Sequence, residues 1–278
     1  MSNGTNWVGG IALDTIPLDI FDTYERRMVP AVFRPWAERL IDAAGLRSGE
    51  RVLDVACATG IVARVAAERV GPSGSVTGLD LLAGMLEAAR IASKDVDPQI
   101  QWVEGNAAEM PLPESSFDAA LCQQGLQFFP DKVAALKEVR RVLASGGRAL
   151  MSVWGSIEHS PAVEALQRAL ERHVPDVAGF LPVVFSLSDP EQLAGLLREA
   201  GFVEVSVLAV TADVSFASVE DYLHTYLGST PLGGIVASLP QERRDAIGED
   251  IAGSLREYIG PTGLTFPQET NVASGTAP

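Results

Sequence analysis

The stretch Arg51-Val-Leu-Asp-Val-Ala-Cys-Ala-Thr-Gly60 decides the fold that we predict for this chain. Its first half, Val52 to Val55, is an apolar run that contains one acid, which is typical of a buried strand. A turn of small residues follows, and Ile61 begins a segment with the apolar pattern of a helix. A strand that turns sharply into a helix presents backbone N–H groups to a ligand. The stretch therefore predicts a βα crossover with a ligand at its turn.

Strands and helices alternate regularly after this crossover. The sequence predicts strands at 51–55, 75–79, 100–103, 117–122, 148–154 and 202–210, and a last strand at 264–273. Strands that alternate with helices form βαβ units, which build a parallel sheet with helices on both faces. We therefore expect an α/β fold with a doubly wound, mostly parallel sheet of seven strands. Pro267 would confine the last strand to an edge of this sheet.

The remaining segments predict the organisation of the chain. We expect a flexible N-terminal arm at 1–20 and a single domain at 21–278, with its core at 46–210. Cap elements are predicted at 21–45, as N-terminal helices, and at 215–260, as a helical insertion near the C-terminus. Pro30 and Pro35 predict a break between two short helices in the first cap. The tail Ser274–Pro278 is predicted to be disordered.

The composition argues against several classes of function. With a net charge of −15 over 278 residues, the chain lacks the clustered Lys and Arg that bind nucleic acid. Its two cysteines, Cys57 and Cys122, suggest no disulfide framework, and its three scattered histidines give no metal spacing. No secretory signal is evident, and no apolar run approaches the roughly 20 residues that span a bilayer. We expect a cytoplasmic protein that binds no nucleic acid and has no membrane span; its oligomeric state stays open.

An acid at the end of the second strand strengthens the case for a ligand at the turn. Asp80 lies 20 residues after Gly60 (80 − 60), where a carboxylate can accept both hydroxyls of a ribose. The alternative is that the small residues only permit a tight βα connection. The turn and the acid together favour a nucleotide-type ligand.

Five motifs follow one another along the chain: Val52-Leu-Asp-Val-Ala-Cys-Ala-Thr-Gly60, Val76-Thr-Gly-Leu-Asp80, Gly105-Asn-Ala-Ala-Glu109, Ser116-Phe-Asp118 and Val142-Leu-Ala-Ser-Gly-Gly147. In this order they resemble the motifs of class I S-adenosylmethionine-dependent methyltransferases, most closely the small-molecule branch that includes the ubiquinone/menaquinone C-methyltransferases. The resemblance implies a small-molecule substrate. The resemblance is strong over about residues 20–155. It implies a Rossmann-like sheet whose last strand runs antiparallel, and S-adenosyl-L-methionine as the cofactor.

The resemblance also implies which residues bind that cofactor. Asp54 would hold the methionine ammonium, while Ala56 and Gly60 would let the backbone approach the amino-acid end. Asp80 would take the ribose hydroxyls. Leu81 would pack on the adenine, Asn106 and Ala107 would flank its edge, and Gln123 would lie beside the methionine end. Gln123 has an alternative role, in which it only bonds a neighbouring loop.

The turn departs from the family pattern at two positions. The family usually has glycine where this chain has Ala56 and Ala58, and only Gly60 remains. A Cβ at a position of close approach or of positive φ costs on the order of 1 kcal/mol. Ala58 therefore bears on the prediction of cofactor affinity rather than on the prediction of the fold, and its effect on that affinity stays open.

Methyl transfer from a sulfonium requires mainly alignment of the reacting atoms, and a base only if the acceptor must lose a proton. His159 follows the fifth strand and is the leading candidate for that base. The alternative is that Glu158 and His159 merely lead into the next helix. His224 is a weaker candidate, and His173 is expected only to complement a helix dipole.

Substrate contacts are expected from the elements that vary over the cleft. Their aromatic and apolar side chains suggest an acceptor that is largely apolar or aromatic, although paired aromatics are more often core. The expected substrate-binding residues are Tyr24, Met28, Gln127, Phe128 and Tyr222.

Two other functions compete with methyl transfer. An NAD(P)-dependent oxidoreductase would also use Asp80, but the turn is not a G-x-G-x-x-G and no Tyr-x-x-x-Lys pair follows. A fold relative that binds the cofactor without transferring methyl, as a cyclase or a binding module, gains some weight from Ala58.

Overall fold

The computed structural model describes residues 7–8, 11–12 and 18–278 of the chain, and these residues form two compact units. The first unit holds residues up to Val32 together with Gly155–Ser186 and Thr211–Glu269. The second unit is made of Phe33–Trp154, Leu187–Val210 and Thr270–Pro278. Each unit is therefore assembled from segments that are far apart in the sequence.

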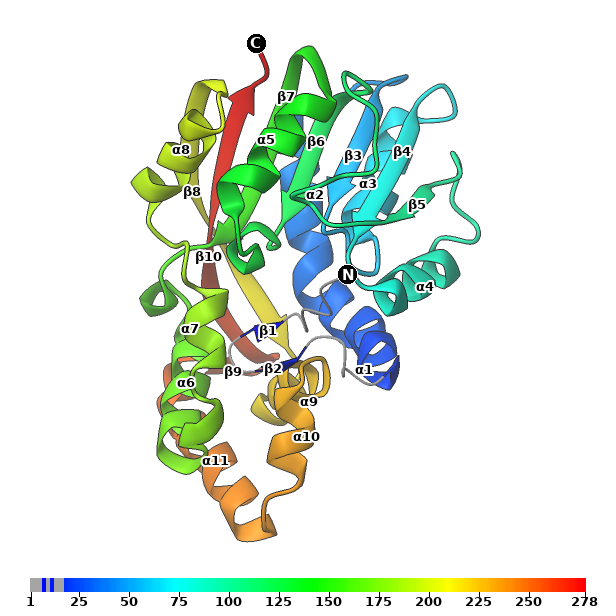
Figure 1. Ribbon diagram of the computed structural model, residues 1–278. Helices are drawn as coiled ribbons and strands as arrows, with labels where there is room; N and C mark the ends of the chain where they lie inside the picture. Colours follow the sequence, from blue (N-terminus) through cyan, green and yellow to red (C-terminus); the bar gives the residue numbers. More distant parts are fainter. Residues whose placement is uncertain (1–6, 9–10, 13–17) are drawn as a thin grey trace. The chain divides into compact units, whose positions relative to one another are not determined.

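The second unit is built on the predicted sheet, which the strands cross in the order β5-β4-β3-β6-β7-β10-β8 (Figure 1). These strands are β3 (Arg51–Val55), β4 (Ser75–Asp80), β5 (Gln101–Glu104), β6 (Phe117–Gln123), β7 (Leu143–Trp154), β8 (Val203–Phe216) and β10 (Gly263–Thr276). Strands β5, β4, β3, β6 and β7 pair in parallel, and β10 pairs antiparallel to β7. The predicted Rossmann-like fold is confirmed. The short β9 (Ile259–Gly260) adds a further strand beside β10.

Helices cover both faces of this sheet because alternate residues of each strand point to opposite faces. One face carries α5 (Lys132–Val142) and α8 (Pro190–Glu199), which pack together over a core that includes Leu53, Cys122 and Met151. The opposite face carries α2 (Arg34–Ala44) and α3 (Ile61–Val70), where Trp36 of α2 contacts Trp154 of β7 edge to face at 6.3 Å. Helix α4 (Ala83–Ala92) lies beside β5, and the short η3 (Leu126–Phe128) follows β6. The sheet is therefore doubly wound.

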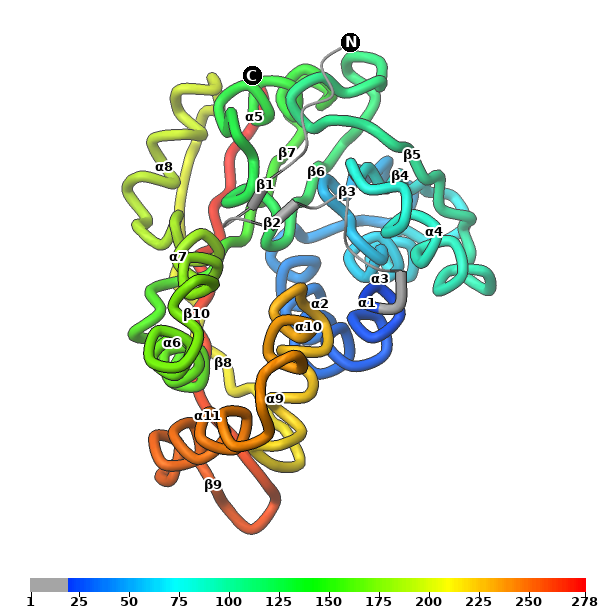
Figure 2. The backbone as a smooth tube through the Cα atoms, turned by 60° about the horizontal axis from the view of Figure 1, so that its bottom comes forward, coloured from blue at the N-terminus to red at the C-terminus, as the bar shows by residue number. Residues whose placement is uncertain are grey.

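The expectation that Pro267 keeps the last strand at an edge is wrong. Strand β10 lies between β7 and β8, as Figures 1 and 2 both show. Its pairing with β7 uses residues 270–276 only, so Pro267 lies outside that ladder. The N–H that proline lacks is therefore not required there, and β8 becomes the edge strand.

The expectation that the C-terminal tail is disordered is also wrong. Ser274, Gly275 and Thr276 pair with β7. Beyond the strand, Ala277 donates to Gly147 O and accepts from Gly146 N, both at 2.8 Å. The tail has no apolar pattern, so the sequence predicts coil. In the structure, its hydrogen bonds to β7 hold it as a strand.

The N-terminal helical segment has no break at its prolines. It runs from α1 (Leu18–Thr23) through a π-helix, η2 (Tyr24–Phe33), into α2. Pro35 lies in the first turn of α2, where a missing N–H leaves no hydrogen bond unmade. Pro30 lies inside the π-helix. The proline-break prediction is therefore replaced by a change of helix type.

The first unit is mainly helical, and the predicted insertion helices are confirmed. Besides α1 and most of η2, its helices and helical turns are η4 (Ile157–His159), α6 (Pro161–His173), η5 (Pro175–Val177), α7 (Phe180–Val184), α9 (Val219–Gly228), α10 (Leu232–Ala237), α11 (Gln241–Ser254) and η6 (Arg256–Tyr258). Figures 1 and 2 show α6 beside α11. Its aromatic core comprises Phe216, Tyr222, Tyr226 and Phe266. Within the described part of the chain, no helix has the length and apolar character of a membrane span.

The predicted division of the chain differs from these two units. Residues 155–186, which we placed in the core, belong to the first unit, and Phe33 to Gly45 of the predicted cap belong to the second. The single-domain assignment of 21–278 stays a prediction. The flexible arm falls largely on residues 1–6, 9–10 and 13–17, which lie outside the described residues; β1 (Trp7–Val8) and β2 (Ile11–Ala12) pair antiparallel.

Candidate active site

The turn between β3 and α3 contains two alanines with left-handed backbone. The φ angle is 55° at Ala56, 48° at Ala58 and 82° at Gly60. In this region a Cβ approaches the backbone carbonyl, so glycine adopts it readily and alanine does not. The turn has alanine where the family usually has glycine, yet its backbone at Ala56 and Ala58 adopts the conformation that glycine favours.

Asp80 holds this turn in place. Its Oδ2 accepts the N–H of Ala58 at 2.8 Å, and its Oδ1 accepts the N–H of Leu82 at 2.9 Å. Burial raises the pKa of Asp80, although the backbone N–H groups that bind the carboxylate oppose the shift. The N–H of Leu81 also bonds this carboxylate, and binding of ribose hydroxyls by the lone pairs that are left stays a prediction. Asp80 thus connects the end of β4 to the strained turn.

Asp54 stabilises the first turn of α3 by accepting a backbone hydrogen bond. Its Oδ2 accepts the N–H of Ala63 at 2.9 Å, which satisfies one of the free donors in the first turn of that helix. The side chain is only 1% exposed, and this burial, together with the charge of Asp80, raises its pKa well above the usual value. Asp54 therefore has a structural partner, and its contact with a methionine ammonium stays a prediction.

Gly60 is required by packing as well as by backbone conformation. A Cβ added at Gly60 would lie 2.3 Å from Cη2 of Trp102, and one added at Gly78 would lie 2.3 Å from Cζ3 of the same ring. The indole thus lies across two glycines, one in the turn and one in β4. Sequence reasoning missed Trp102, although Gly78 inside a strand is a known sign of such close approach.

The residues predicted for the adenine end differ in exposure. Leu81 is 42% exposed, unusual for a large apolar side chain, and follows Asp80 directly. Asn106 is exposed, and its Oδ1 accepts the N–H of Ala108 at 2.9 Å. Ala107 is buried in the core, so only its backbone is suited to bind a ring nitrogen. An exposed leucine beside a buried acid fits an adenosine.

Gln123 ends β6 on the face covered by α2. Its Nε2 donates to Phe33 O at 2.9 Å, which is the loop contact that we considered as an alternative. Its Oε1 is buried and, among the described residues, has no hydrogen-bond partner; the same holds for Oγ1 of Thr59 in the turn. Unpaired buried acceptors are uncommon in native proteins. These two atoms fit a ligand that donates hydrogen bonds, as a methionine ammonium does.

Cys57 and Cys122 are free and buried. Burial raises the pKa of both thiols, that of Cys122 to about 12, so neither is ionised near neutral pH. A Cβ at Gly125 would lie 2.9 Å from Sγ of Cys122. This close packing supports the view that the cysteines fill space rather than react.

The predicted substrate residues are divided between the two units. Gln127 and Phe128 lie after β6 in the second unit; Gln127 is only 2% exposed, with both amide atoms unpaired among the described residues. Tyr24, Met28 and Tyr222 belong to the first unit. Tyr222 is fully buried, and its hydroxyl donates to Ala162 O at 2.7 Å. Substrate contact by any of these residues stays a prediction.

His159 has a carboxylate partner that the sequence does not reveal. Its Nδ1 lies 2.7 Å from Oε1 of Glu269, which is 110 residues away in the chain. This carboxylate raises the pKa of His159. No local pattern links the two residues, since only the return of β10 brings them together. The other candidates are also paired: His173 with Asp250 at 2.8 Å, and His224 with Arg27 at 3.2 Å.

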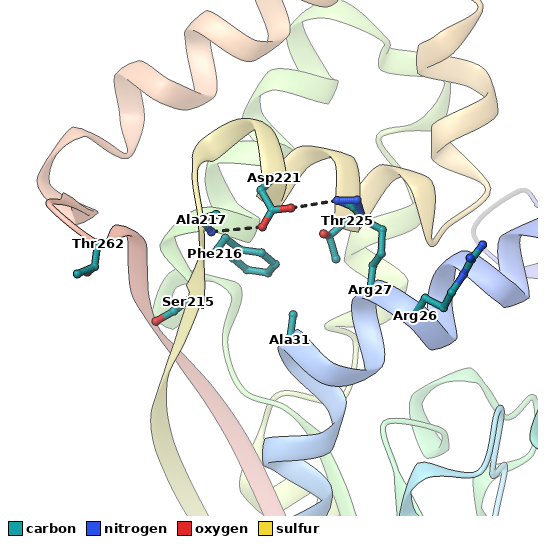
Figure 3. A pocket seen from close by; sticks show the side chains of 9 residues that line it. All are labelled: Arg26, Arg27, Ala31, Ser215, Phe216, Ala217, Asp221, Thr225 and Thr262. Carbon is teal, nitrogen blue, oxygen red and sulfur yellow. Dashed lines mark hydrogen bonds and ion pairs between the residues drawn. The ribbon is translucent and has the colours of Figure 1, made fainter. Parts of the chain in front are cut away.

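The first unit also contains a pocket of about 570 Å³. Figure 3 shows Arg27 reaching from η2 to Asp221 of α9, and Phe216 beside them. The Nη2 of Arg27 lies 3.1 Å from Oδ1 of Asp221, whose Oδ2 accepts the N–H of Ala217 at 3.2 Å. The ion pair ties η2 to α9 and forms one wall of the pocket. No group of three or more His, Cys, Asp or Glu among the described residues could hold a metal ion.

Comparison with known proteins agrees with this geometry. Residues 52–147 match a family model described as a methyltransferase domain. Demethylmenaquinone methyltransferase of Staphylococcus aureus is 31% identical over 192 residues, which cover 65% of this chain and 79% of that relative.

Solved structures share the fold. A Bacillus halodurans protein (BH2331), named as a methyltransferase, gives a TM-score of 0.57 at 21% identity and covers 87% of this chain and 98% of that chain. The cyclase SpnF gives a TM-score of 0.53 at 19% identity, over 87% of this chain and 80% of that chain. At such identities the two structures support the fold alone. Given the relative at 31% identity, most of whose length is matched, the chain belongs to the class I S-adenosylmethionine-dependent methyltransferases.

Proposed function

We propose that the protein transfers a methyl group from S-adenosyl-L-methionine to an O, N or C atom of a small, partly apolar or aromatic metabolite. The observation that carries this proposal is Asp80, a buried carboxylate that adjoins both the strained turn and the exposed Leu81. In this proposal the free lone pairs of Asp80 accept the ribose hydroxyls, and Leu81 covers one face of the adenine. The backbone N–H groups near Asn106 and Ala107 bind the ring edge.

The methionine end would lie by Gln123 and the turn. S-adenosyl-L-methionine, when bound, supplies a methyl group that is already activated by the sulfonium charge. The unpaired Oε1 of Gln123 and Oγ1 of Thr59 would accept hydrogen bonds from its ammonium, and Asp54 would balance that charge. The protein is then left mainly to align the acceptor atom with the methyl group.

The relative from Staphylococcus aureus suggests which acceptors to test first. It is named as a demethylmenaquinone methyltransferase, so acceptors that contain an aromatic ring derived from a quinone should be tested before other metabolites. Half-buried Phe128, which follows β6 in the second unit, would suit such an apolar ring. Screening of a panel of acceptors would then identify the metabolite and the atom that is methylated.

Titration calorimetry tests the cofactor, with S-adenosylmethionine and NADH in separate experiments. Binding of the first alone is expected; binding of NADH alone would replace the proposal by an oxidoreductase. Incubation with a panel of quinols, phenols and amines then tests transfer through release of S-adenosylhomocysteine. Tight cofactor binding with no release for any acceptor would favour a non-methylating relative, such as the cyclase whose fold the chain shares.

A further inference from the structure

Two consecutive arginines of η2, Arg26 and Arg27, line the pocket of about 570 Å³ in the first unit (Figure 3). Every residue that lines this pocket belongs to the first unit, so the pocket is formed by that unit alone. Its volume falls within the range of sites that bind small molecules. The helix that carries both arginines is π-helical over 10 residues, and π-helical turns are rare and occur frequently at functional sites. Volume and helix type together make the pocket a candidate binding site.

The guanidinium of Arg27 is fixed in place but is not fully hydrogen-bonded. Its Nη2 lies 3.1 Å from Oδ1 of Asp221, and its Nη1 lies 3.2 Å from Nδ1 of His224. Its Nε is buried and has no hydrogen-bond partner among the described residues. A guanidinium has more N–H donors than these two contacts use, and unpaired buried donors are uncommon in native proteins. The unpaired Nε therefore indicates that the protein alone does not complete the surroundings of Arg27.

The charges around the pocket favour an anion. Asp221 is already occupied, since its Oδ1 pairs with Arg27 and its Oδ2 accepts the N–H of Ala217 at 3.2 Å. Arg26 pairs with Asp22, but the two side chains are 72% and 57% exposed. An ion pair this exposed is weak, so Arg26 can exchange it for an anion in the pocket. Two arginines against one acid give the lining a positive excess, in a chain whose net charge is −15.

The other walls suit the body of a small organic molecule. In Figure 3, Phe216, Ala31 and Thr225 surround the space that Arg27 borders. The ring of Phe216 is fixed from behind, because it contacts Tyr222 edge to face at 5.3 Å. The pocket thus combines a cationic end with a rigid aromatic wall.

We propose that this pocket binds the oxyanion of a small organic metabolite, a carboxylate or a phosphate, through the guanidinium groups of Arg26 and Arg27. The planar fork of arginine offers two parallel N–H groups to such an anion. The apolar part of the metabolite lies against Phe216 and Ala31. The site goes beyond the proposed methyl transfer and does not depend on it, because none of the predicted cofactor residues lines this pocket.

Titration calorimetry of the full chain, without S-adenosylmethionine, tests the class of ligand. Benzoate and phenyl phosphate present the two oxyanions on the same ring, and benzylamine presents a cation instead. At least one of the two anions should bind, and benzylamine should not; the anion that binds more tightly identifies the oxyanion. Binding of benzylamine alone, or of none of the three at millimolar concentration, would overturn the proposal.

Arginine variants test whether the anion lies in this pocket. Arg27→Lys keeps the charge but loses the planar fork, so the affinity for the anion should fall at least about tenfold. Arg26→Gln changes an exposed side chain and should lower the affinity by about two- to fivefold. The matched control is Arg243→Gln, which removes the same charge from an exposed position of α11 outside the pocket and should leave the affinity unchanged.

The control also separates a site from a general effect of charge. Equal losses of affinity in Arg26→Gln and Arg243→Gln would reject the site, as would unchanged affinity in Arg26→Gln or in a folded Arg27→Lys. If Arg27→Lys does not fold, because its contact with Asp221 ties η2 to α9, the comparison of Arg26→Gln with Arg243→Gln still decides.

Discussion

At the residue scale, two alanines mark the most unusual feature of the site. Ala56 and Ala58 both adopt positive φ, and a residue with a Cβ is less stable there than glycine by roughly 1 kcal/mol. Such strain persists only where the surroundings determine the conformation. Here the hydrogen bond from Ala58 N to Asp80 does so. Asp80 is thus needed by the turn even before any ligand binds.

Replacing Ala58 by glycine should therefore stabilise the protein. We expect Ala58→Gly to raise the free energy of unfolding by about 1 kcal/mol, since it removes strain and leaves the hydrogen bond to Asp80 intact. Urea unfolding measures the change. The matched control is Ala88→Gly, inside helix α4, which should instead lose about 0.5–1 kcal/mol. If both variants lose stability equally, the turn is not strained at Ala58.

The two roles of Asp80 can be separated by a double variant. Asp80→Asn should lower S-adenosylmethionine affinity at least about tenfold, because bonds to a charged acceptor are worth about 1.5–3 kcal/mol. It should also lower stability, since the amide has one acceptor oxygen for two N–H groups. Adding Ala58→Gly should restore stability without restoring affinity, as calorimetry and urea unfolding would show. Recovery of affinity as well would mean that Asp80 acts only through the turn.

At the element scale, β10 completes the sheet from the far end of the chain. Residues 270–276 pair with β7, and on its other side the strand adjoins β8. Ser274 contacts Ser206 of β8 through their hydroxyls at 2.9 Å. The final residues therefore hold the first half of β7, since Thr276 pairs with Arg148, while Thr270 pairs with Trp154 at the carboxyl end of that strand.

Removal of the last five residues should therefore be costly. A chain that ends at Ala273 loses several ladder hydrogen bonds and buried Ala277, on the order of 2–4 kcal/mol at about 0.5–1.5 kcal/mol each. The melting temperature should fall by roughly 5–10 °C for a chain of this size. A chain that ends at Ala277 is the control, because it lacks only exposed Pro278. Equal melting of the two chains would contradict the pairing of this tail.

At the scale of the whole molecule, two sets of carboxylates act on stability in opposite directions. Glu50, Asp118 and Glu138 pair with arginines, which lower their pKa despite partial burial; they stabilise the fold at neutral pH, and this is lost as pH falls through their folded pKa. Buried Asp54 and Asp80 have raised pKa values, so the folded state holds their protons more tightly. Their contribution to stability declines as pH rises above the ordinary carboxyl range.

Two Asp→Asn variants should show these opposite effects of pH on stability. Asp54→Asn keeps an oxygen for Ala63 N–H and removes the buried charge, so its unfolding free energy relative to the wild type should increase from about pH 4 to about pH 7. Asp118→Asn loses its ion pair with Arg51, so its stability relative to the wild type should decrease as pH rises toward about 4 and stay level from there to about pH 7. Urea unfolding at several pH values compares them. Parallel curves for the two variants would reject these assignments.

Ligand binding should stabilise the molecule by an amount that grows with the logarithm of the ligand concentration once this exceeds Kd. The predicted cofactor residues all belong to the second unit, and a ligand at about 100 times its Kd adds about 2.7 kcal/mol. S-adenosylmethionine should then raise the melting temperature by roughly 5–10 °C. The control is NADH, which should leave it unchanged. A shift caused by NADH alone would contradict the cofactor assignment.

The sequence by itself determined the mostly parallel sheet, the order in which its strands follow one another along the chain, and the position of the turn between β3 and α3. These features depend on local patterns, namely apolar runs, helical spacing and an acid 20 residues after Gly60. Such patterns do not depend on how distant segments of the chain pack. The resemblance then supplied the cofactor roles of Asp54, Asp80 and Leu81. The structure places Asp80 and Leu81 together beside the turn.

Only the tertiary structure decided the contacts between distant segments. Glu269 meets His159, Trp102 covers Gly60 and Gly78, and Pro267 lies in an inner strand, because each depends on where a remote strand returns. The tail likewise becomes ordered through pairing with β7, and not through its own composition. Hydrogen bonds and packing across the sheet have no local signature, so they are decided when the strands assemble.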